Sequence, residues 1–394
     1  MALRTPRPWL MLAVGVLAQA SASVVQSTPA FLIPLLHGER GLSLAEAGLL
    51  AAAPNVGVLL TLVLWGAATD RWGERGVLVI GLLLTAAATA GAIFAQGYVA
   101  LAIAFLVAGM GSACASSASG RVVIGWFPVE RRGLAMGIRQ MSQPLGVGIA
   151  AIVVPALVAS GSLTPALVFA AAFTGIMAAV CAVVIVNPPR PARATDAEGR
   201  PANPYRGDAT LARIHLVSAL LVVPQYVLST FGLVWLIVDQ GWTALAAGAL
   251  VAISQLVGAV GRIGAGVLSD RVGSRLRPLR WVAIAGIPLL LLTAGAGELH
   301  IAPLVAITYL LASCVSVADN GLAFTAVAEI AGAHWSGRAL GAQNTGQFIA
   351  AAAVAPLVGA LIGVVGYSLA FVLIALAPLV AVPLVPVTDT VRKR

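Results

Sequence analysis

The sequence has very little charge for its length. Only 9% of its 394 residues are Asp, Glu, Lys or Arg, whereas a typical soluble domain carries about 25%. So few charged side chains cannot cover a surface that faces water. Apolar residues make up 60% of the chain, and the alternative solvent is lipid, in which each helix satisfies its own backbone hydrogen bonds. The scarcity of charge therefore predicts an all-α membrane protein and argues against a soluble one.

Residues that build disulfides, metal sites and nucleotide sites are also scarce. The three cysteines, Cys114, Cys181 and Cys314, lie in apolar stretches and have neither disulfide nor metal-site spacing. The four histidines are scattered, and the sequence contains no HExxH pair and no GxxxxGK[ST] phosphate-binding loop. We therefore expect no enzymatic activity, no metal and no cofactor, and the basic net charge needs no nucleic acid to explain it.

The apolar runs predict twelve helices, each near the length of about 20 residues that spans a bilayer. The predicted spans are 9–36, 44–67, 76–96, 98–121, 133–158, 164–187, 211–237, 243–268, 279–297, 301–328, 338–364 and 366–387. The longest polar stretch, 188–210, is rich in Pro, Arg, Asp and Gly and predicts a cytoplasmic linker. It would separate an N-terminal six-helix half, 1–187, from a C-terminal six-helix half, 211–394.

The basic residues, nearly all of them arginine, indicate the orientation of the chain. With the N-terminus inside, nineteen of the 23 basic residues fall in cytoplasmic segments and one, Arg40, falls outside. Such an excess of positive charge marks cytoplasmic loops. Arg4 and Arg7 imitate a secretory signal, but the apolar run continues through Leu36, so we expect a retained first helix. The pattern predicts a multi-pass protein of the bacterial inner membrane with both termini in the cytoplasm.

The two halves repeat one another when the chain is shifted by 200 residues. The positions that match are Gly66, Asp70, Arg71 and Gly73 with Gly266, Asp270, Arg271 and Gly273. Matches of Ala, Leu or Gly alone have little weight in this composition, but an Asp-Arg-x-Gly pair in register does. The repeat predicts two parallel halves related by an axis along the membrane normal, which is one of the transporter architectures.

The stretch from Gly66 to Arg75 resembles the loop 2–3 signature of the major facilitator superfamily, Gly-x-x-x-Asp-Arg-x-Gly-Arg-Arg. The stretch from Gly266 to Arg275 resembles its weaker counterpart in loop 8–9. The resemblance covers the whole chain and implies a monomeric, alternating-access transporter with twelve helices that takes a small molecule across the lipid bilayer. Glu74 departs from the family pattern, which often has a base at that position.

The resemblance assigns these loop residues to a cytoplasmic gate. In the superfamily, such an Asp-Arg pair ties the cytoplasmic ends of the two halves together while the cavity faces outward. The gate candidates are Gly66, Asp70, Arg71, Gly73, Arg75, Gly266, Asp270, Arg271 and Gly273. The alternative is a pair of solvated turns that carry the cytoplasmic positive charge, and the repetition of the pattern favours the gate.

We assign four ionisable residues to the membrane interior: Arg121, Arg139, Arg262 and Asp319. A charge at the centre of a membrane helix costs about 2.5–3.5 kcal/mol on insertion scales, so a function is the default hypothesis. Three arginines against one aspartate would be neutralised by an anionic substrate. Arg121 could instead extend to the cytoplasmic edge, Arg139 could belong to the gate, and Asp319 could be either a fixed partner of an arginine or the carrier of a coupled proton.

Arg262 stands four residues before Gly266, a spacing that resembles the helix-eight arginine of monocarboxylate, oxalate and nitrate transporters, which contacts the anion. Monocarboxylate carriers usually have a carboxylate four residues earlier, where this chain has Gly258, and a lysine in the first helix, which is absent. Nitrate carriers have an arginine in the second helix, where only Asn55 is found. The chain is closer to cyanate-permease-like carriers of small organic anions.

Neutral polar side chains in several helices provide further candidates for a central site. They are Gln26, Gln143, Gln225, Tyr226, Asn344 and Gln347. For each one taken singly, the alternative is a hydrogen bond between helices, worth about 0.6 kcal/mol on average.

The sequence is compatible with two functions. The first is a secondary carrier of a small organic anion, such as a monocarboxylate, driven by proton symport or by exchange. The second is proton-coupled multidrug efflux. Drug antiporters of the superfamily have an Arg-x-x-Gln-Gly pattern in the fourth helix, and this chain reads Val107-Ala108-Gly109-Met110-Gly111 there. That difference argues against efflux.

Overall fold

The computed structural model describes residues 7–38, 41–158, 162–188, 203–206 and 208–387. Within these ranges the chain is helical and has no β-strand, which confirms the all-α fold. Of the predicted linker 188–210, residues 189–202 and 207 lie outside the described ranges.

Eleven helical runs of the described chain are long and apolar enough to cross a membrane. The last run, Ser336–Leu384, has 49 residues and contains Gly366 with φ 77° and ψ 173°, a conformation outside the helical range. At about 1.5 Å per residue this run is long enough for two crossings. The structure therefore contains the twelve membrane helices that the hydropathy predicts.

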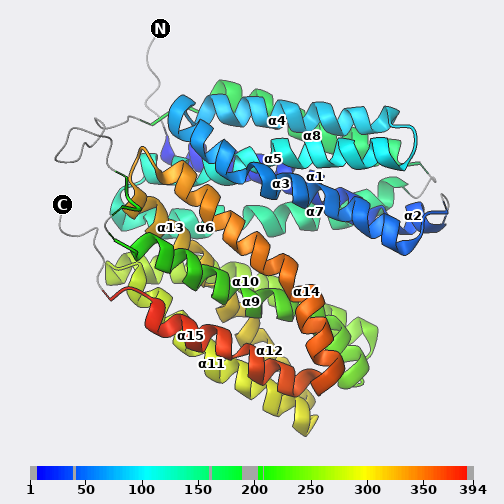
Figure 1. Ribbon diagram of the computed structural model, residues 1–394, viewed down its shortest axis with the longest axis vertical. Helices are drawn as coiled ribbons and strands as arrows, with labels where there is room; N and C mark the ends of the chain where they lie inside the picture. The colour runs from blue at the N-terminus through cyan, green and yellow to red at the C-terminus, as the bar shows by residue number, and fades with distance from the viewer. Residues whose placement is uncertain (1–6, 39–40, 159–161, 189–202, 207, 388–394) are drawn as a thin grey trace. The chain divides into compact units, whose positions relative to one another are not determined.

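The chain divides into two compact units (Figure 1). Unit 1 comprises 1–127, 141–195 and 332–342, and unit 2 comprises 128–140, 196–331 and 343–394. Each unit thus contains one short segment from the other half of the sequence. These two segments, 332–342 in unit 1 and 128–140 in unit 2, are called the exchanged segments below.

The helices of unit 1 are mostly long membrane helices. They are α1 (Pro8–Phe31), α2 (Ile33–Gly38), α3 (Leu44–Trp72), α4 (Glu74–Gly91), α5 (Tyr98–Trp126), α7 (Ser142–Val158) and α8 (Thr164–Val184). Backbone contact between α3 and α5 is close because glycines lie at the crossing. A Cβ on Gly57 would lie 2.1 Å from the Leu106 carbonyl oxygen, and one on Gly109 would lie 2.0 Å from that of Pro54. Small residues allow this approach in membranes, where apolar burial does not draw helices together.

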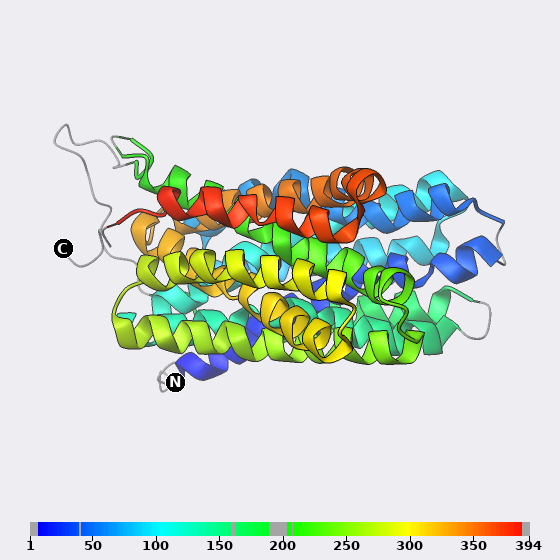
Figure 2. The ribbon, with the colours of Figure 1, turned by 90° about the horizontal axis from the view of Figure 1, so that it is seen from below.

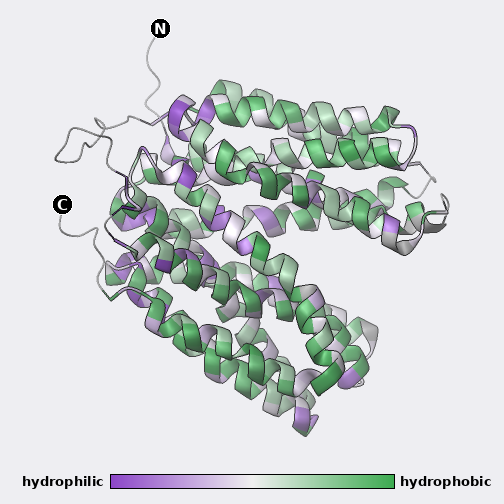
Figure 3. Ribbon diagram, viewed as in Figure 1, coloured by the Kyte–Doolittle hydropathy of each residue, from purple (hydrophilic) through white to green (hydrophobic). Residues whose placement is uncertain are grey.

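Unit 2 contains the corresponding long helices, some of which are divided into shorter pieces. Its helices are α6 (Arg132–Arg139), α9 (Thr210–Val234), a π-helix (Trp235–Asp239), α10 (Ala244–Val272), α11 (Leu276–Leu299), α12 (Ala302–Ser316), α13 (Asp319–Ala331), most of α14 (Ser336–Ile374) and α15 (Leu376–Leu384). Figure 2 shows α15 running alongside α11. In each unit, hydrophobic residues cover the helix shafts and hydrophilic residues gather near helix ends (Figure 3).

The repeat extends to the helix ends. Helices α3 and α10 both have 29 residues and begin and end 200 positions apart. The Ser43 hydroxyl accepts from the backbone of Glu46 before α3, and the Thr243 hydroxyl accepts from the backbone of Ala246 before α10. Both helices stop at a glycine with positive φ, Gly73 at 94° and Gly273 at 63°, which only glycine adopts readily. The predicted pair of repeats is thereby confirmed.

Two predicted spans are divided in the structure. The span 133–158 is split into α6 and α7 after Arg139, and the span 301–328 is split into α12 and α13 at Val317 and Ala318. Hydropathy did not reveal either break, because the averaged hydropathy of each stretch is that of a single membrane span and neither break carries a proline. The second break makes Asp319 the first residue of α13, where a carboxylate is favoured by the helix dipole.

Candidate transport site

In unit 1, the carboxylate of Asp70 binds the start of α14. Its Oδ1 accepts from the Gly337 backbone N–H at 2.8 Å, and its Oδ2 accepts from the Arg338 N–H at 3.0 Å. The first N–H groups of a helix have no partner within the helix, so a carboxylate placed there satisfies them and the helix dipole together. We call this contact the Asp70 junction; it holds the exchanged segment 332–342.

Unit 2 contains the same contact at the repeated position. Asp270 accepts from the N–H of Gly133 at 2.9 Å and from that of Leu134 at 2.8 Å, at the start of α6. This Asp270 junction holds the exchanged segment 128–140. The two acids of the repeated motif thus perform the same task on two helix starts.

Glycine is required on both sides of each junction. A Cβ on Gly66 would lie 2.3 Å from the Gly337 carbonyl oxygen, and one on Gly337 would lie 2.3 Å from that of Gly66. Gly266 and Gly133 have the same relation, at 2.2 and 2.4 Å. The backbones touch directly, so any side chain would separate the helix start from its aspartate.

The charged partners of the two aspartates differ. In unit 1, Arg121 on α5 lies 3.0 Å from Asp70 and 3.2 Å from Glu74, and all three side chains are buried. Arg121 also donates to the Thr69 carbonyl at 3.0 Å. The structure thus places Arg121 between two acids, and it gives Glu74, which the sequence alone left without a role, a partner.

In unit 2 the arginine comes from the motif itself. Arg275 lies 2.6 Å from Asp270 and 3.3 Å from Glu329 on α13, and it donates to the Val129 carbonyl of the exchanged segment. Arg132 of that segment lies 3.5 Å from Glu329. Burial lowers the pKa of Arg275, but Glu329 and Asp270 outweigh it and raise that pKa above its usual value. Sequence reasoning missed Glu329, for which the repeat gives no signal because Val129 stands at the matching position.

The other gate candidates lie at the surface or at turns. Arg71, Arg75 and Arg271 are exposed. The backbone N–H of Arg75 is bound by the Asn187 side chain at 2.9 Å. Gly73 and Gly273 are the turn glycines that end α3 and α10.

Arg262 and Asp319 lie close together in unit 2 without an ion pair. The Arg262 Nη1 donates to the Gln140 carbonyl at 3.3 Å, whereas its Nε–H is buried and has no hydrogen-bond partner among the described residues. Asp319 is fully buried, and its carboxylate lies beside the backbone N–H groups of Asp319 and Asn320 at the start of α13, with no partner at full hydrogen-bond geometry within the described ranges. The two side chains interact electrostatically. A half-buried guanidinium and a buried carboxylate with unused bonding capacity are an unusual arrangement.

Arg139 is the second intramembrane arginine of unit 2. It is 1% exposed, and its guanidinium lies 5.6 Å from the centre of the Phe324 ring, close enough for a cation–π contact. It donates to the Gln140 side chain at 2.8 Å. Gln140 therefore contacts Arg139 through its side chain and Arg262 through its backbone.

A chain of amides crosses unit 2. Asn320 donates to Gln225 at 2.9 Å, and Gln347 donates to Asn320 at 2.8 Å and to Ser218 at 2.7 Å. These bonds join α9, α13 and α14. Asn320 was not among the predicted candidates; its position directly after Asp319 was the one available signal.

The remaining candidates are dispersed. In unit 1, Gln26 donates to Ser112 at 2.9 Å, and Gln143 is exposed. In unit 2, Tyr226 is half-buried and interacts electrostatically with Arg262, and Asn344 is half-buried on α14. No group of three possible metal ligands occurs in the part of the chain that was described.

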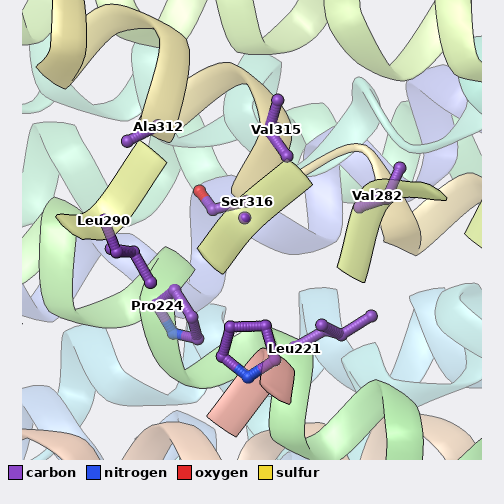
Figure 4. A pocket seen from close by; sticks show the side chains of 9 residues that line it. Leu221, Pro224, Val282, Leu290, Ala312, Val315 and Ser316 are labelled. Atoms are coloured by element: carbon purple, nitrogen blue, oxygen red, sulfur yellow. The ribbon is translucent and has the colours of Figure 1, made fainter. Parts of the chain in front are cut away.

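Two neighbouring pockets share Ser316 of α12 in their linings. One is lined by apolar side chains of α9, α11, α12 and α15 and by the hydroxyl of Ser316 (Figure 4). The other, of about 40 Å³, contains Arg262 and is lined by amides and hydroxyls, including those of Gln225, Ser254 and Gln255. The second pocket brings together two predicted site residues, Arg262 and Gln225.

These features define a multi-pass helical membrane protein made of two repeats, and the comparisons identify its family. The model of the Major Facilitator Superfamily matches residues 15–355. An uncharacterized MFS-type transporter of Mycobacterium tuberculosis is 45% identical over 383 residues, which are 96% of this chain and 85% of that protein. The chain belongs to the Major Facilitator Superfamily and is a membrane transporter of that family.

A more distant relative and a solved structure agree with this placement. A probable sulfoacetate transporter of Cupriavidus necator is 27% identical over 351 residues, covering 82% of this chain and 80% of that one. The crystal structure of the human organic anion transporter MFSD10 matches with a TM-score of 0.75 at 18% identity, over 97% of this chain and 100% of the other. The structural match shows the shared fold.

Proposed function

We propose that the protein is a secondary carrier of a small organic anion, with one carboxylate or equivalent acid group, across the bacterial inner membrane. The observation that carries this proposal is Arg262, which lines a polar pocket and keeps a buried N–H donor unused. A guanidinium is always charged and can bind a carboxylate through two parallel hydrogen bonds. A relative named for an anionic substrate, sulfoacetate, supports the anion class.

Asp319 provides a means of coupling transport to protons. Arg262 is the cation that interacts electrostatically with Asp319. Tyr226 interacts electrostatically with Arg262, and Arg139 packs on Phe324, which lies on the same helix as Asp319. An anion bound to Arg262 takes that positive charge from Asp319, and one proton on Asp319 then restores neutrality. This exchange would make substrate and proton bind together, which is symport.

The two junctions supply the conformational element. Alternating access requires contacts that form in one state and break in another. Each junction consists of a few hydrogen bonds to one helix start, so each can break without unfolding a helix. We assign the release of the exchanged segments to the step that changes access, and both termini to the cytoplasm.

Ligand-dependent thermal stabilisation of the purified protein tests the anion proposal. A ligand that binds the folded state raises its stability by mass action. We expect small carboxylates or sulfonates to stabilise the wild type, and Arg262→Ala to weaken that binding by at least about thirtyfold, since truncating one member of a buried charge pair costs about 2–5 kcal/mol. Arg262→Lys keeps the charge without the paired geometry and should bind at an intermediate level.

The matched control is Arg277→Ala, an arginine that is exposed at the start of α11. It should leave ligand binding unchanged. Stabilisation by neutral or cationic compounds alone, to the same extent in Arg262→Ala, would contradict the proposal.

The coupling role of Asp319 predicts a specific separation of activities. In proteoliposomes, Asp319→Asn should lose accumulation driven by a proton gradient and retain exchange of internal for external substrate, because the amide cannot carry a proton. Wild-type uptake should increase as the external pH is lowered, and uptake by Asp319→Asn should not. A variant that still accumulates substrate on a proton gradient would exclude this role.

A further inference from the structure

The polar pocket of unit 2 has more hydrogen-bonding groups than an anion needs. It lies among α9, α10 and α12, and its side chains include Gln225, Ser254, Gln255, Arg262 and Ser313. A volume of about 40 Å³ accommodates roughly three water-sized groups, at about 10–15 Å³ each. The pocket is therefore the right size for a few hydroxyl groups of a ligand, beside the guanidinium.

Several of these groups have unused bonding capacity. Gln225 accepts from Asn320 through Oε1, but its NH₂ has no partner among the described residues. Gln255 is exposed on α10 and makes no side-chain hydrogen bond within the described chain, and the buried Ser313 hydroxyl interacts with the hydroxyl of Tyr309. An amide carries two donors and one acceptor oxygen, and a hydroxyl can donate and accept. With Arg262 Nε–H, the pocket thus presents both unused donors and unused acceptors.

The contrast with the neighbouring pocket shows that this polarity is local. The pocket of Figure 4 shares α9 and α12 with it, yet its walls are leucine, valine, alanine and proline apart from the Ser316 hydroxyl. An apolar ligand would suit the walls of the pocket in Figure 4. In the pocket of Arg262, the same ligand would leave the amide groups without hydrogen-bond partners. A buried polar group without a partner costs about 1–3 kcal/mol.

We infer that the substrate is a hydroxylated monocarboxylate, of the sugar-acid or hydroxy-acid class, whose acid group binds Arg262 and whose hydroxyls bind Gln225, Gln255 and Ser313. This inference rests on the proposed anion function and narrows it. Hydroxyl groups both donate and accept, so they complement this mixture of side chains, whereas the chain of an alkyl acid does neither. A site that hydrogen-bonds a substrate hydroxyl rejects the analogue without it far more strongly than an apolar pocket rejects an added group.

Equilibrium binding with matched pairs of acids tests the inference on the full-length protein. Gluconate and hexanoate have the same carbon number and one carboxylate each and differ in hydroxyls, and glycerate and propionate form a shorter pair. We expect the hydroxylated member of at least one pair to bind about a hundredfold tighter. Gln255→Met should reduce that preference by about tenfold and leave the affinity for the alkyl acid unchanged.

The controls separate this inference from the proposed function. Gln96→Met replaces an exposed glutamine outside the pocket and should change neither affinity. Equal or tighter binding of the alkyl acids would overturn the hydroxylated class and leave the anion carrier intact. Binding of no acid, with binding of neutral sugars or cations instead, would overturn both. A preference for gluconate that Gln255→Met leaves intact would also overturn the assignment of the pocket.

Discussion

Arg121→Met is expected to lower the free energy of unfolding by about 3–5 kcal/mol, the cost of removing one partner from a buried ion pair. Arg121 is 4% exposed and is the cation that pairs with both Asp70 at 3.0 Å and Glu74 at 3.2 Å. Without it, both carboxylates stay buried with less compensating positive charge, although Arg338 remains 3.9 Å from Asp70. Chemical unfolding in detergent measures the loss, and transport should fall with it.

A second substitution makes the prediction specific to charge. Glu74→Gln removes one of the two acids, so the double variant Arg121→Met, Glu74→Gln should be more stable than Arg121→Met alone, by about 2 kcal/mol. The matched control is Arg75→Met, the same change at an exposed arginine next to Glu74, and it should be nearly neutral. Additive losses in the double variant would show that Arg121 and Glu74 do not form a coupled pair.

Gly66→Ala and Gly266→Ala should each open one junction. The added Cβ would lie 2.3 Å from the Gly337 carbonyl oxygen in the first case and 2.2 Å from that of Gly133 in the second. Each helix start must move away from its aspartate, with the loss of two hydrogen bonds to a charged acceptor, together about 3 kcal/mol. Hydrogen exchange at the Gly337 and Arg338 amides should accelerate by about a hundredfold in Gly66→Ala, and transport should fall.

Each helix provides its own control. Gly48 on α3 and Gly264 on α10 have open space where a Cβ would be, so Gly48→Ala and Gly264→Ala should leave exchange and transport unchanged. Both also test whether alanine itself alters these helices. Unchanged amide exchange in Gly66→Ala would mean that direct backbone contact does not hold the start of α14.

The sequence predicts the helices and the repeat well because both leave periodic or charge-based signals. Low charge, long apolar runs and the excess of arginine on one side follow from the energetics of lipid, which act on each segment separately. The two Asp-Arg-x-Gly motifs predict two equivalent turns, and the structure has them at Gly73 and Gly273. The breaks before α7 and α13 were not predicted, because the averaged hydropathy across each of them is that of one continuous membrane span.

The partners of the charged residues could not be predicted in the same way. The sequence places Arg121 inside a span, but its contact with Glu74 joins residues 47 positions apart and depends on how α4 packs on α5. The repeat would suggest equal charge partners for the two aspartates, and the structure shows Arg121 at one and Arg275 at the other. Asn320 was not predicted as a site residue because its role depends on hydrogen bonds with Gln225 and Gln347, which only the folded structure brings together.

The amino-acid sequence by itself determined that this chain is a twelve-helix membrane transporter of two repeats, since solvent preference and motif spacing are properties of the chain taken in order. The tertiary structure decided which buried charges are satisfied and which are not. Arg121 is paired with two acids, whereas Arg262 and Asp319 retain unused atoms in unit 2. The physical reason is that the free energy of a buried charge depends on the groups within a few ångströms of it, and those groups come from helices far apart in sequence.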